Sequence, residues 1–397
     1  MGELPSVEDA LARVLGRVAP LDSQHVQVAE ASGRVVAEAA RARTDLPPFP
    51  SSAMDGYAVR SADVPGTLPV AFEVAAGRAS RDPLPPGAAA AIATGGAVPD
   101  GADAVVPIEL VTSGDGTVEV PGAVGPGAHV RPRGGDVREG DVVVAPGVRL
   151  GPAQLGALAA AGIAEVVCAR RPRVSVLATG SELRSPGETL GHGQIYESNR
   201  VMLAAVLAGA GAGVDQLPPV ADDEQEHRDA LARGLESDVL VTSGGVSVGP
   251  HDLVRGIEAE LGVEEVFWGI AVKPGKPLAF GVRGSTLVFG LPGNPVSSLV
   301  GSLLFVAPAI LALQGAADPG PLYQSATTAS VLRRNERRDE YVRATRRLDT
   351  DGVVVEPIDG QDSHMIVRAS AADALVRVPR GEGEIPVGAA VRYVALA

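Results

Sequence analysis

The sequence predicts a multidomain α/β plus β protein built around a doubly wound, mainly parallel α/β domain. At 397 residues the chain is too long for one ordinary core, since domains average about 150 residues. Strand-like and helix-like runs alternate between Arg173 and Gln314, and such alternation produces a parallel sheet with helices on both faces. Short Val-rich runs separated by Gly and Pro occupy about 45–133 and the last part of the chain, which indicates β-rich units.

The first predicted element is a helix over Ser6 to Val18. Ser6 and Asp9 match a capping box. Its apolar face has helical spacing and consists of Val7, Leu11, Val14, Leu15 and Val18. A second helix is predicted over Gly151 to Ala161. Because helical pieces flank the β-rich stretch on both sides, we expect that stretch to be inserted into a discontinuous domain.

The α/β domain follows as an alternating series. In order, its predicted strands and helices are RVSVLATG, NRVMLAAVLAGA, VDQLPPV, DDEQEHRDALARGL, DVLVTSGG, DLVRGIEAEL, VEEVFWGI, PLAFGV, TLVFGL and a helix from Pro295. Ligands bind such sheets at the carboxyl ends of the strands. Near the C-terminus, the runs EYVRAT, GVVVEPI, ALVRVP and AVRYVAL predict a small β-sandwich or barrel.

The composition argues against several classes of partner. The formal charge of −14 disfavours nucleic acid, because its binding draws affinity from releasing cations around the polymer. Cys168 is the only cysteine, so no internal disulfide forms and a reducing, cytoplasmic location is expected. The apolar run Ser297 to Leu313 falls short of a membrane span and contains Pro308. No signal pattern precedes the first helix, so we expect no membrane partner.

The stretch TSGGVSVGPHD has two interpretations. The run from Gly245 to Gly249 fits the spacing of a hydrolase nucleophile elbow, whereas the glycines and hydroxyls also suit a backbone cradle for phosphate. An elbow serine directly follows its strand and leads into a helix, but here other residues intervene and Pro250 follows. The only histidine beyond His251 is His364, in the β-rich tail. These departures disfavour serine hydrolysis.

Two further loops follow predicted strands of the α/β domain. Thr179-Gly180-Ser181-Glu182 follows RVSVLA, and Leu291-Pro292-Gly293-Asn294-Pro295 follows TLVFG. We expect Asn294 to cap the next helix and Pro295 to occupy its first turn, so that free amides face the strand end and attract an anion. Taken alone, the second loop is also typical of a purely structural turn.

Charged residues cluster in these loops. Lys273 and Lys276 lie in KPGKP; lysines are common on solvated loops, but in an acidic chain this pair favours a phosphate or oxyanion partner. Glu182 and Asp252 follow glycine-containing loops, which makes them candidates to hold a hard divalent cation. Asp222 is a further acidic candidate, unless it simply caps the helix after it. Lysines and carboxylates at one edge suit metal-assisted chemistry on a phosphorylated anion.

A set of motifs runs in order through about Thr44 to Leu313. The motifs are FPSSAMDGYAVR, ATGGAVPDGADAVV, RPRGGD, ATGSEL, GQIYESNR, TSGGVSVGPHD, KPGKPLAFG and GLPGNPVSS. In this order they resemble the molybdopterin molybdenumtransferase family, which includes the catalytic end domain of gephyrin. TSGGVSVG alone is less specific, because related molybdopterin-binding domains share it.

The resemblance implies a chain of four domains and an elongated homodimer. The domains are an elongated discontinuous domain (1–22, 41–49 and 140–165), an inserted β-rich domain (23–40 and 50–139), an α/β molybdopterin-binding domain (166–317) and a C-terminal β-barrel domain (318–397). The implied active cleft lies between the α/β domain of one subunit and the inserted domain of the other.

The resemblance also implies a reaction. Molybdenum from molybdate is inserted into adenylylated molybdopterin, with Mg²⁺ or another divalent cation, and AMP is released in the final step of molybdenum cofactor synthesis. Molybdopterin adenylyltransferase and molybdoenzyme apoproteins are the implied partners. Two alternatives stay open from sequence: adenylylation of molybdopterin by a related α/β domain, and a scaffolding protein with a degenerate site. Molybdate and tungstate are not distinguished either.

Site residues are carried over from the family by position in the motifs. The implied catalytic residues are Asp55, Asp136, Glu182, Asp222 and Asp252, of which Glu182 and Asp252 are also the implied metal ligands. The implied substrate-binding residues are Thr94, Arg131, Thr179, Gly180, Ser243, Gly244, Gly245, Ser247, Lys273, Lys276, Pro292, Asn294 and Pro295. Four positions depart from the family's usual pattern, and they are Pro50, Ser51, Gly135 and Glu197. Glu197 stands where an Asp is common, and the four departures together put local polar contacts and one possible metal contact in doubt.

Overall fold

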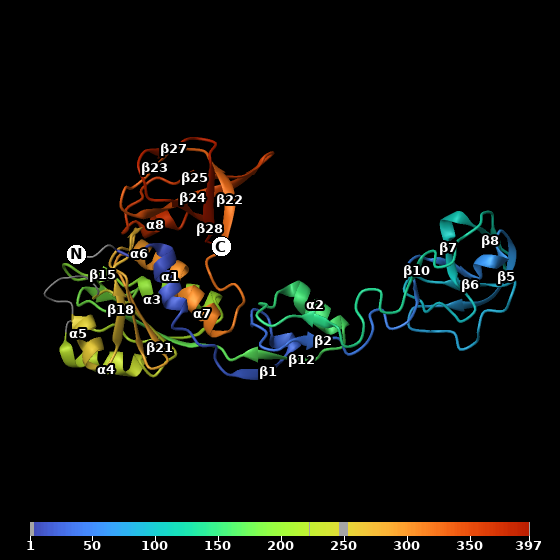
Figure 1. The fold of residues 1–397 in the computed structure, drawn as a ribbon, viewed down its shortest axis with the longest axis horizontal. Coiled ribbons are helices and arrows are strands. Elements are labelled where there is room, and N and C mark those ends of the chain that lie inside the picture. Colours follow the sequence, from blue (N-terminus) through green and yellow to red (C-terminus); the bar gives the residue numbers. More distant parts are fainter. Residues whose placement is uncertain (1–3, 222, 246–252, 397) are drawn as a thin grey trace.

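The computed structural model describes residues 4–221, 223–245 and 253–396. Figure 1 shows an elongated molecule, in which an α/β unit and the C-terminal β unit lie next to each other at one end. A separate β-rich unit lies at the other end, and a narrow segment containing β1, β2, β12 and α2 connects the two. The predicted combination of α/β and β units is confirmed.

The α/β unit is built on a six-stranded sheet with the order β16-β13-β17-β21-β20-β18. The first four strands are parallel, while β20 and β18 are antiparallel to their neighbours. One apolar cluster joins the sheet to α1, α3, α6 and α7, and another joins it to α4 and α5. The strands are β13 (Arg173–Ala178), β16 (Gly213–Gln216), β17 (Val239–Ser243), β18 (Glu264–Trp268), β20 (Ala279–Arg283) and β21 (Thr286–Leu291), and the helices between them are α3 (Asn199–Gly209), α4 (Glu224–Gly234) and α5 (Leu253–Glu260). A doubly wound, mainly parallel domain is therefore present, as predicted.

The apolar run that follows β21 is one continuous helical segment. It consists of α6 (Pro295–Gly301), the π-helical η4 (Ser302–Val306) and α7 (Ala307–Leu313). The π-helical register immediately precedes the turn that contains Pro308, whose ring cannot fit a regular helix interior. Contrary to the prediction, the segment is long and apolar enough to cross a membrane, but 72% of its apolar window is buried inside the protein. A core helix of a soluble fold has the same character.

The opening helix α1 (Val7–Leu15) begins where predicted, because the Ser6 hydroxyl accepts a hydrogen bond from Asp9 N at 3.0 Å. Its buried face, Val7, Ala10 and Val14, belongs to the core of the α/β unit. This helix therefore packs on the α/β unit, whereas the predicted division places residues 1–22 in the elongated domain.

The connecting segment has a small core of its own. Strand β1 (Ser23–Gln27) pairs with β12 (Glu165–Ala169), β2 (Ala40–Arg41) pairs with β11 (Val142–Val144), and η1 (Val28–Glu30) and α2 (Pro152–Ala160) pack beside them. Val26, Val28 and Val36 are buried in this core. The predicted division assigns 23–40 to the inserted β-rich domain, and the structure differs there because β1 pairs with a strand far along the chain.

The β-rich unit is a six-stranded sheet with the order β7-β4-β6-β5-β9-β8. Apolar clusters cover both of its faces, with Val59 in one and Ala58 in the other, as alternation along a strand requires. Its elements are β4 (Gly56–Val59), η2 (Ser61–Asp63), β5 (Gly66–Val74), β6 (Ala89–Ile92), β7 (Ala104–Pro107), η3 (Ile108–Leu110), β8 (Thr112–Gly114) and β9 (Thr117–Val120), with the two-stranded pair β3 (Ser51–Ser52) and β10 (Val130–Arg131) beside it.

The C-terminal unit is a closed barrel. The strands run in the order β24-β25-β22-β28-β26, and β26 pairs back onto β24. Of the two predicted forms, sandwich or barrel, the barrel is therefore correct. Its elements are β22 (Tyr323–Thr328), β23 (Leu332–Arg333), β24 (Asp339–Asp349), β25 (Gly352–Pro357), α8 (Ile366–Ala369), β26 (Ala374–Val378), β27 (Glu384–Ile385) and β28 (Ala390–Ala395). The short strand β19 (Val272–Lys273) of the α/β unit pairs with β24, which ties the predicted lysine loop to the barrel.

Candidate active site

Three loops meet at the carboxyl ends of the parallel strands β13, β17 and β21. Thr179 N donates to Ser243 O at 3.1 Å, and Gly244 N donates to Leu291 O at 3.0 Å. The backbone ladder of the sheet thus continues past the strands into the loops. The structure brings the first residues of all three predicted loops to one edge of the sheet.

Two glycines let these loops approach each other closely. Gly244 has a φ of +93°, and a Cβ added there would lie 2.7 Å from Thr179 O. Gly245 has a φ of +65°, and a Cβ there would overlap the Val254 side chain. Only glycine adopts these angles without strain in so small a space. The backbone is therefore closely packed in the described part of the predicted cradle; Ser247 lies outside the described residues.

A buried amide holds the ends of β17 and β21 together. Asn199 Nδ2 donates to Ser243 Oγ at 2.7 Å and to Gly293 O at 2.8 Å. Both side chains are buried, and the two contacts span the strand-end loops. Asn199, the last residue but one of GQIYESNR, was not among the predicted site residues, although GQIYESNR is one of the motifs that carry the resemblance. Ser243 is therefore engaged with Asn199 and not exposed to a ligand.

The Glu182 carboxylate lies exposed at the same edge. It lies directly against Gly180, where an added Cβ would overlap the carboxylate. The other implied metal ligand, Asp252, lies outside the described residues, as does Asp222. Within residues 4–221, 223–245 and 253–396 no group of three or more metal-binding side chains occurs. Glu182 alone does not make a metal site, but its exposed oxygens suit a hard cation.

Two other carboxylates near these loops already have partners. Glu197 is 2% exposed and accepts hydrogen bonds from Arg200 N at 2.8 Å and Arg200 Nε at 3.1 Å. Asp223 accepts from Glu226 N at 2.9 Å and caps α4. The Glu197 carboxylate is thus buried in a local ion pair with Arg200, which leaves it poorly placed to contact a metal. The cap of α4, for which Asp222 was an alternative, is Asp223.

The lysine loop lies beside the start of α6. A Cβ at Gly275 would be 3.5 Å from Ser297 O, so the loop passes over the first turn of that helix. Lys273 Nζ forms an ion pair with Glu340 Oε1 of β24 at 2.9 Å. Lys276 is half-buried and forms no ion pair with another described residue. Of the two lysines, Lys276 is therefore the one whose charge is free to meet an anion.

The start of α6 is held by the barrel rather than by its own cap. Asn294 occupies the position before the helix and Pro295 its first turn, as predicted, but the Asn294 side chain makes no capping bond. It donates instead to Ser363 Oγ at 2.9 Å, while Val296 N donates to Ser363 O at 3.0 Å. Neither Ser363 nor Glu340 was predicted, because nothing in their local sequence shows that barrel residues reach this edge.

In the β-rich unit, Asp55 and Thr94 form a close pair. Asp55 Oδ1 accepts from Thr94 N at 2.7 Å and from Thr94 Oγ1 at 2.9 Å. These bonds favour the charged form and hold the pKa of Asp55 below its ordinary value. Asp55 follows β3, and Gly56 opens β4 where a Cβ would overlap Val106 O. The aspartate is therefore ionised and fixed at the edge of the sheet.

Arg131 lies on the strand next to this pair. It sits opposite Ser51 in the pairing of β10 with β3, and both Arg131 and Asp136 are exposed. Asp136 lies further along, where its amide donates to Leu46 O at 2.9 Å. The structure thus pairs Asp55 with Thr94 beyond the C-terminal end of β3, whereas Arg131 lies opposite Ser51 at the start of that strand and Asp136 lies on the following connection.

These two groups of residues lie at opposite ends of one chain. The strands β5, β6, β7 and β10 are at one end of the elongated molecule, and the helices α3–α7 are at the other (Figure 1). One subunit therefore does not bring Asp55 to the lysine loop.

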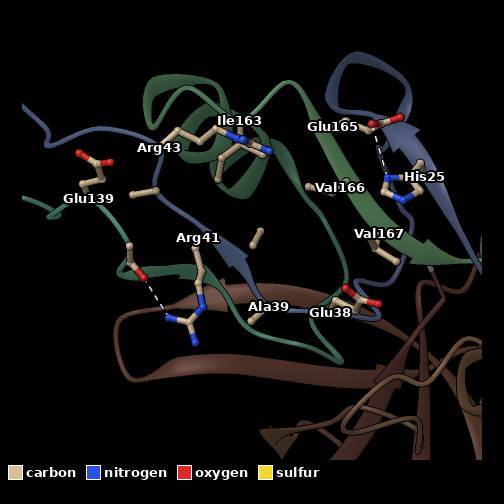
Figure 2. A pocket seen from close by; sticks show the side chains of 13 residues that line it. His25, Glu38, Ala39, Arg41, Arg43, Glu139, Ile163, Glu165, Val166 and Val167 are labelled. Carbon is tan, nitrogen blue, oxygen red and sulfur yellow. Dashed lines mark hydrogen bonds and ion pairs between the residues drawn. The ribbon is translucent and has the colours of Figure 1, made fainter.

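The connecting segment contains a cavity that none of the predicted site residues within the described part of the chain line. The cavity has a volume of about 550 Å³, and Figure 2 shows that side chains of both charges line it. His25 lies 3.4 Å from Glu165, and Arg41 donates to Gly140 O at 2.9 Å. No predicted site residue lines this cavity, so it is separate from the strand-end site.

The chain matches three family models that together cover most of its length. Residues 5–162 match the MoeA N-terminal region (domain I and II), residues 175–312 match a probable molybdopterin binding domain, and residues 325–396 match the MoeA C-terminal region (domain IV). The order is the one that the motifs predicted.

Curated relatives and solved structures agree. The chain is 36% identical to the molybdopterin molybdenumtransferase of Haemophilus influenzae, over 94% of this chain and 93% of that one. It is 38% identical to molybdopterin molybdenumtransferase 2 of Mycobacterium tuberculosis, over 91% and 92%. The crystal structure of the molybdopterin biosynthesis MoeA protein from Pyrococcus horikoshii OT3 covers 99% of the chain with a TM-score of 0.85 at 28% identity, and 100% of that chain is covered. Together these matches show that the chain belongs to the MoeA family of molybdopterin molybdenumtransferases.

Proposed function

We propose that this protein inserts molybdenum from molybdate into adenylylated molybdopterin, with release of AMP, at a site shared by two subunits. The observation that carries the proposal is the meeting of three strand-end loops beside the lysine loop at the start of α6. The names of the relatives support the same reaction.

The chemistry needs such an arrangement because both reactants are anions. Molybdate and the diphosphate of the substrate repel each other, so fixed cations and amides must hold them together. Lys276 supplies an ammonium group, and Gly244 and Gly245 keep the loop backbone compact enough to cradle a phosphate. Positioning of this kind accelerates a transfer without a covalent intermediate.

A divalent cation, proposed as Mg²⁺, would be held by Glu182 together with Asp252. Its part would be to offset the negative charge of the reacting oxygens. The exposed carboxylate of Glu182 above Gly180 fits a hard cation. The side chains near it that are buried or paired, such as Glu197, are not proposed as ligands.

We further propose that Asp55, Thr94, Arg131 and Asp136 act on a substrate bound to the other subunit. Within one chain these residues lie far from the lysine loop (Figure 1). A homodimer in which the β-rich unit of one subunit reaches the α/β unit of its partner would complete the site. The ionised Asp55 would then face the lysine loop across the subunit boundary.

The proposed place of the protein is the cytoplasm, between two other proteins of the pathway. A molybdopterin adenylyltransferase would supply the adenylylated substrate, and molybdoenzyme apoproteins would receive the product. The division into four domains remains our prediction. The exceptions are α1, which packs on the α/β unit, and residues 23–40, which pack in the connecting segment.

The direct test measures AMP released from adenylylated molybdopterin with molybdate and Mg²⁺, and the activity that the product restores to a molybdoenzyme apoprotein. Absence of AMP release with every divalent cation tried would overturn the proposal. Consumption of ATP with molybdopterin would favour adenylylation instead, and calorimetric binding without turnover would favour a scaffold. Parallel reactions with tungstate show which oxyanion is preferred.

Mixing two impaired variants, at a substrate concentration well below KM, tests whether the site is shared. If Asp55 and Lys276 serve one site from different subunits, Asp55→Ala and Lys276→Ala homodimers that exchange subunits regain one intact site per mixed dimer. Random exchange then restores about one quarter of the wild-type rate. If both residues act within one subunit, the mixture is no faster than the two separate variants.

A further inference from the structure

Glu258 is a buried acid in a position where an apolar side chain would be expected. It lies on the face of α5 that packs against the sheet, one turn after Val254, and only 7% of it is exposed. Its Oε1 atom makes no hydrogen bond to any other described residue. A buried polar atom without a partner is costly and rare, so Glu258 calls for an explanation.

The neighbouring charges do not neutralise Glu258. Arg255, on the same helix, donates to Glu265 Oε2 of β18 at 2.9 and 2.7 Å and also lies 5.2 Å from the centre of the Trp268 ring. Burial raises the pKa of Glu258 to about 8; Arg255 lowers it and Glu265 raises it further. The carboxyl is therefore mostly protonated near neutral pH.

Glu258 lines a cavity of about 390 Å³ beneath α5. The floor of the cavity comes from β20 and β21, where Ala279 lies opposite Gly290 and Gly281 lies opposite Val288. Cross-strand partners point to the same face of a sheet, and three of these four residues have no side chain beyond Cβ. The sheet therefore adds little side-chain volume to the floor of the cavity, and over Gly281 the space is taken by the Val263 side chain.

The cavity is lined by a carboxyl group and by apolar side chains, and both limit the chemistry of a ligand that fits it. A carboxyl oxygen without a partner needs a hydrogen-bond donor, and a cation would also favour its ionised form. Val263, Val288 and Ala279 offer an apolar wall for a short hydrocarbon. The size falls in the lower part of the range for small-molecule sites. The net charge of −14 further favours a cation over an anion.

We propose that this cavity is a second ligand site, which takes a small primary ammonium compound through an ion pair with the Glu258 carboxylate. The site is distinct from the strand-end site, because it lies between α5 and the sheet. It is nevertheless adjacent in structure, since Gly290 of its floor is on the strand that leads into the Pro292 loop. Its test does not depend on the proposed reaction, because binding is measured without molybdopterin.

The experiment is calorimetric titration of the full chain with n-butylammonium at pH 7, in two buffers of different ionisation enthalpy. Pairing with the ammonium ionises a carboxyl whose pKa is about 8, so about 0.9 proton should leave per ligand bound. The apparent affinity should rise about tenfold from pH 6 to pH 7. Butan-1-ol, of the same chain length but neutral, should bind at least tenfold more weakly.

Glu258→Gln should lose at least tenfold in affinity and all of the proton release. Glu260→Gln is the matched control, since Glu260 is on the same helix and exposed and undergoes the same substitution; it should bind like the wild type. Glu258→Leu, which removes the buried acid, provides a second folded variant that should not bind. No binding of n-butylammonium to the folded wild type, equal binding by Glu258→Gln, or equally tight binding of butan-1-ol would each overturn the proposal.

Discussion

Thr94 donates two hydrogen bonds to a single oxygen of Asp55, from its amide at 2.7 Å and from its hydroxyl at 2.9 Å. Both bonds lower the pKa of Asp55. The loop after β6 thereby fixes the position and the charge of the aspartate that follows β3. The two residues are 39 positions apart in the sequence, and their hydrogen bonds join the two segments into one unit.

Replacement of Asp55 by Ala should abolish AMP release and leave the fold intact, because the side chain is exposed and supports no core contact. AMP release and circular dichroism measure the two outcomes. Unchanged turnover in Asp55→Ala would remove this residue from the mechanism.

Replacement of Thr94 by Val should shift the pH dependence of the rate. The variant keeps the amide bond and loses the hydroxyl bond, so the pKa of Asp55 should rise toward its ordinary value. If ionised Asp55 is needed, the loss of activity on the acid side should then begin at a higher pH than in the wild type. Thr94→Ser, which retains the hydroxyl, should keep the wild-type profile; an identical profile for Thr94→Val would contradict the role of this bond.

The two lysines should respond differently to substitution. Lys276 has no ion-pair partner within the described part of the chain, so Lys276→Ala should raise KM for the adenylylated substrate by about 10–100-fold, the effect of one charged hydrogen bond. Glu340→Gln should lower KM, because it releases the Lys273 ammonium from its ion pair at 2.9 Å. Steady-state AMP release over a range of substrate concentrations measures both. A higher KM in Glu340→Gln would show that Glu340 positions Lys273 instead of competing for it.

The backbone of the cradle should tolerate no side chain at Gly244. Gly244 has a φ of +93°, and the Cβ of an alanine there would lie 2.7 Å from Thr179 O. Gly244→Ala is therefore strained by about 1–3 kcal/mol. Urea unfolding should show this loss together with reduced AMP release. Gly256→Ala is the control, because Gly256 is on the exposed face of α5 with open space around it. That substitution should stabilise the protein by about 0.5–1 kcal/mol.

Much of the α/β unit could be predicted from local patterns. Alternation of β13, α3, β16 and α4 in sequence is the direct cause of a parallel sheet, and the strand-end loops follow from it. Pro295 in the first turn of α6 was likewise a local signal. These features need only neighbouring residues, which is why sequence alone could specify them.

The rest depends on contacts between distant segments. Nothing near Ser363 indicates that it would take the Asn294 amide, and nothing near Glu340 indicates that it would pair with Lys273. The pairing of β1 with β12 decides that residues 23–40 belong to the connecting segment. Glu258 likewise has an unremarkable sequence context, and only its burial beside a cavity makes it unusual.

The buried Glu258 should make the stability of the protein depend on pH. The pKa of Glu258 is about 8 in the folded protein, and its ordinary value, which applies to the unfolded chain, is 4.5. Between pH 4.5 and pH 8 the folded state therefore holds the proton more tightly than the unfolded state. The free energy of unfolding therefore falls as pH rises from 4.5 to 8, and the loss is complete above 8. Glu258→Leu removes this loss, so its gain over the wild type should grow by a few kcal/mol between pH 5 and pH 8. Urea unfolding at pH 5, 6, 7 and 8 measures the gain, and Glu260→Gln should show none that varies in this way. A gain that is constant across the four pH values would mean that Glu258 does not titrate in its burial site.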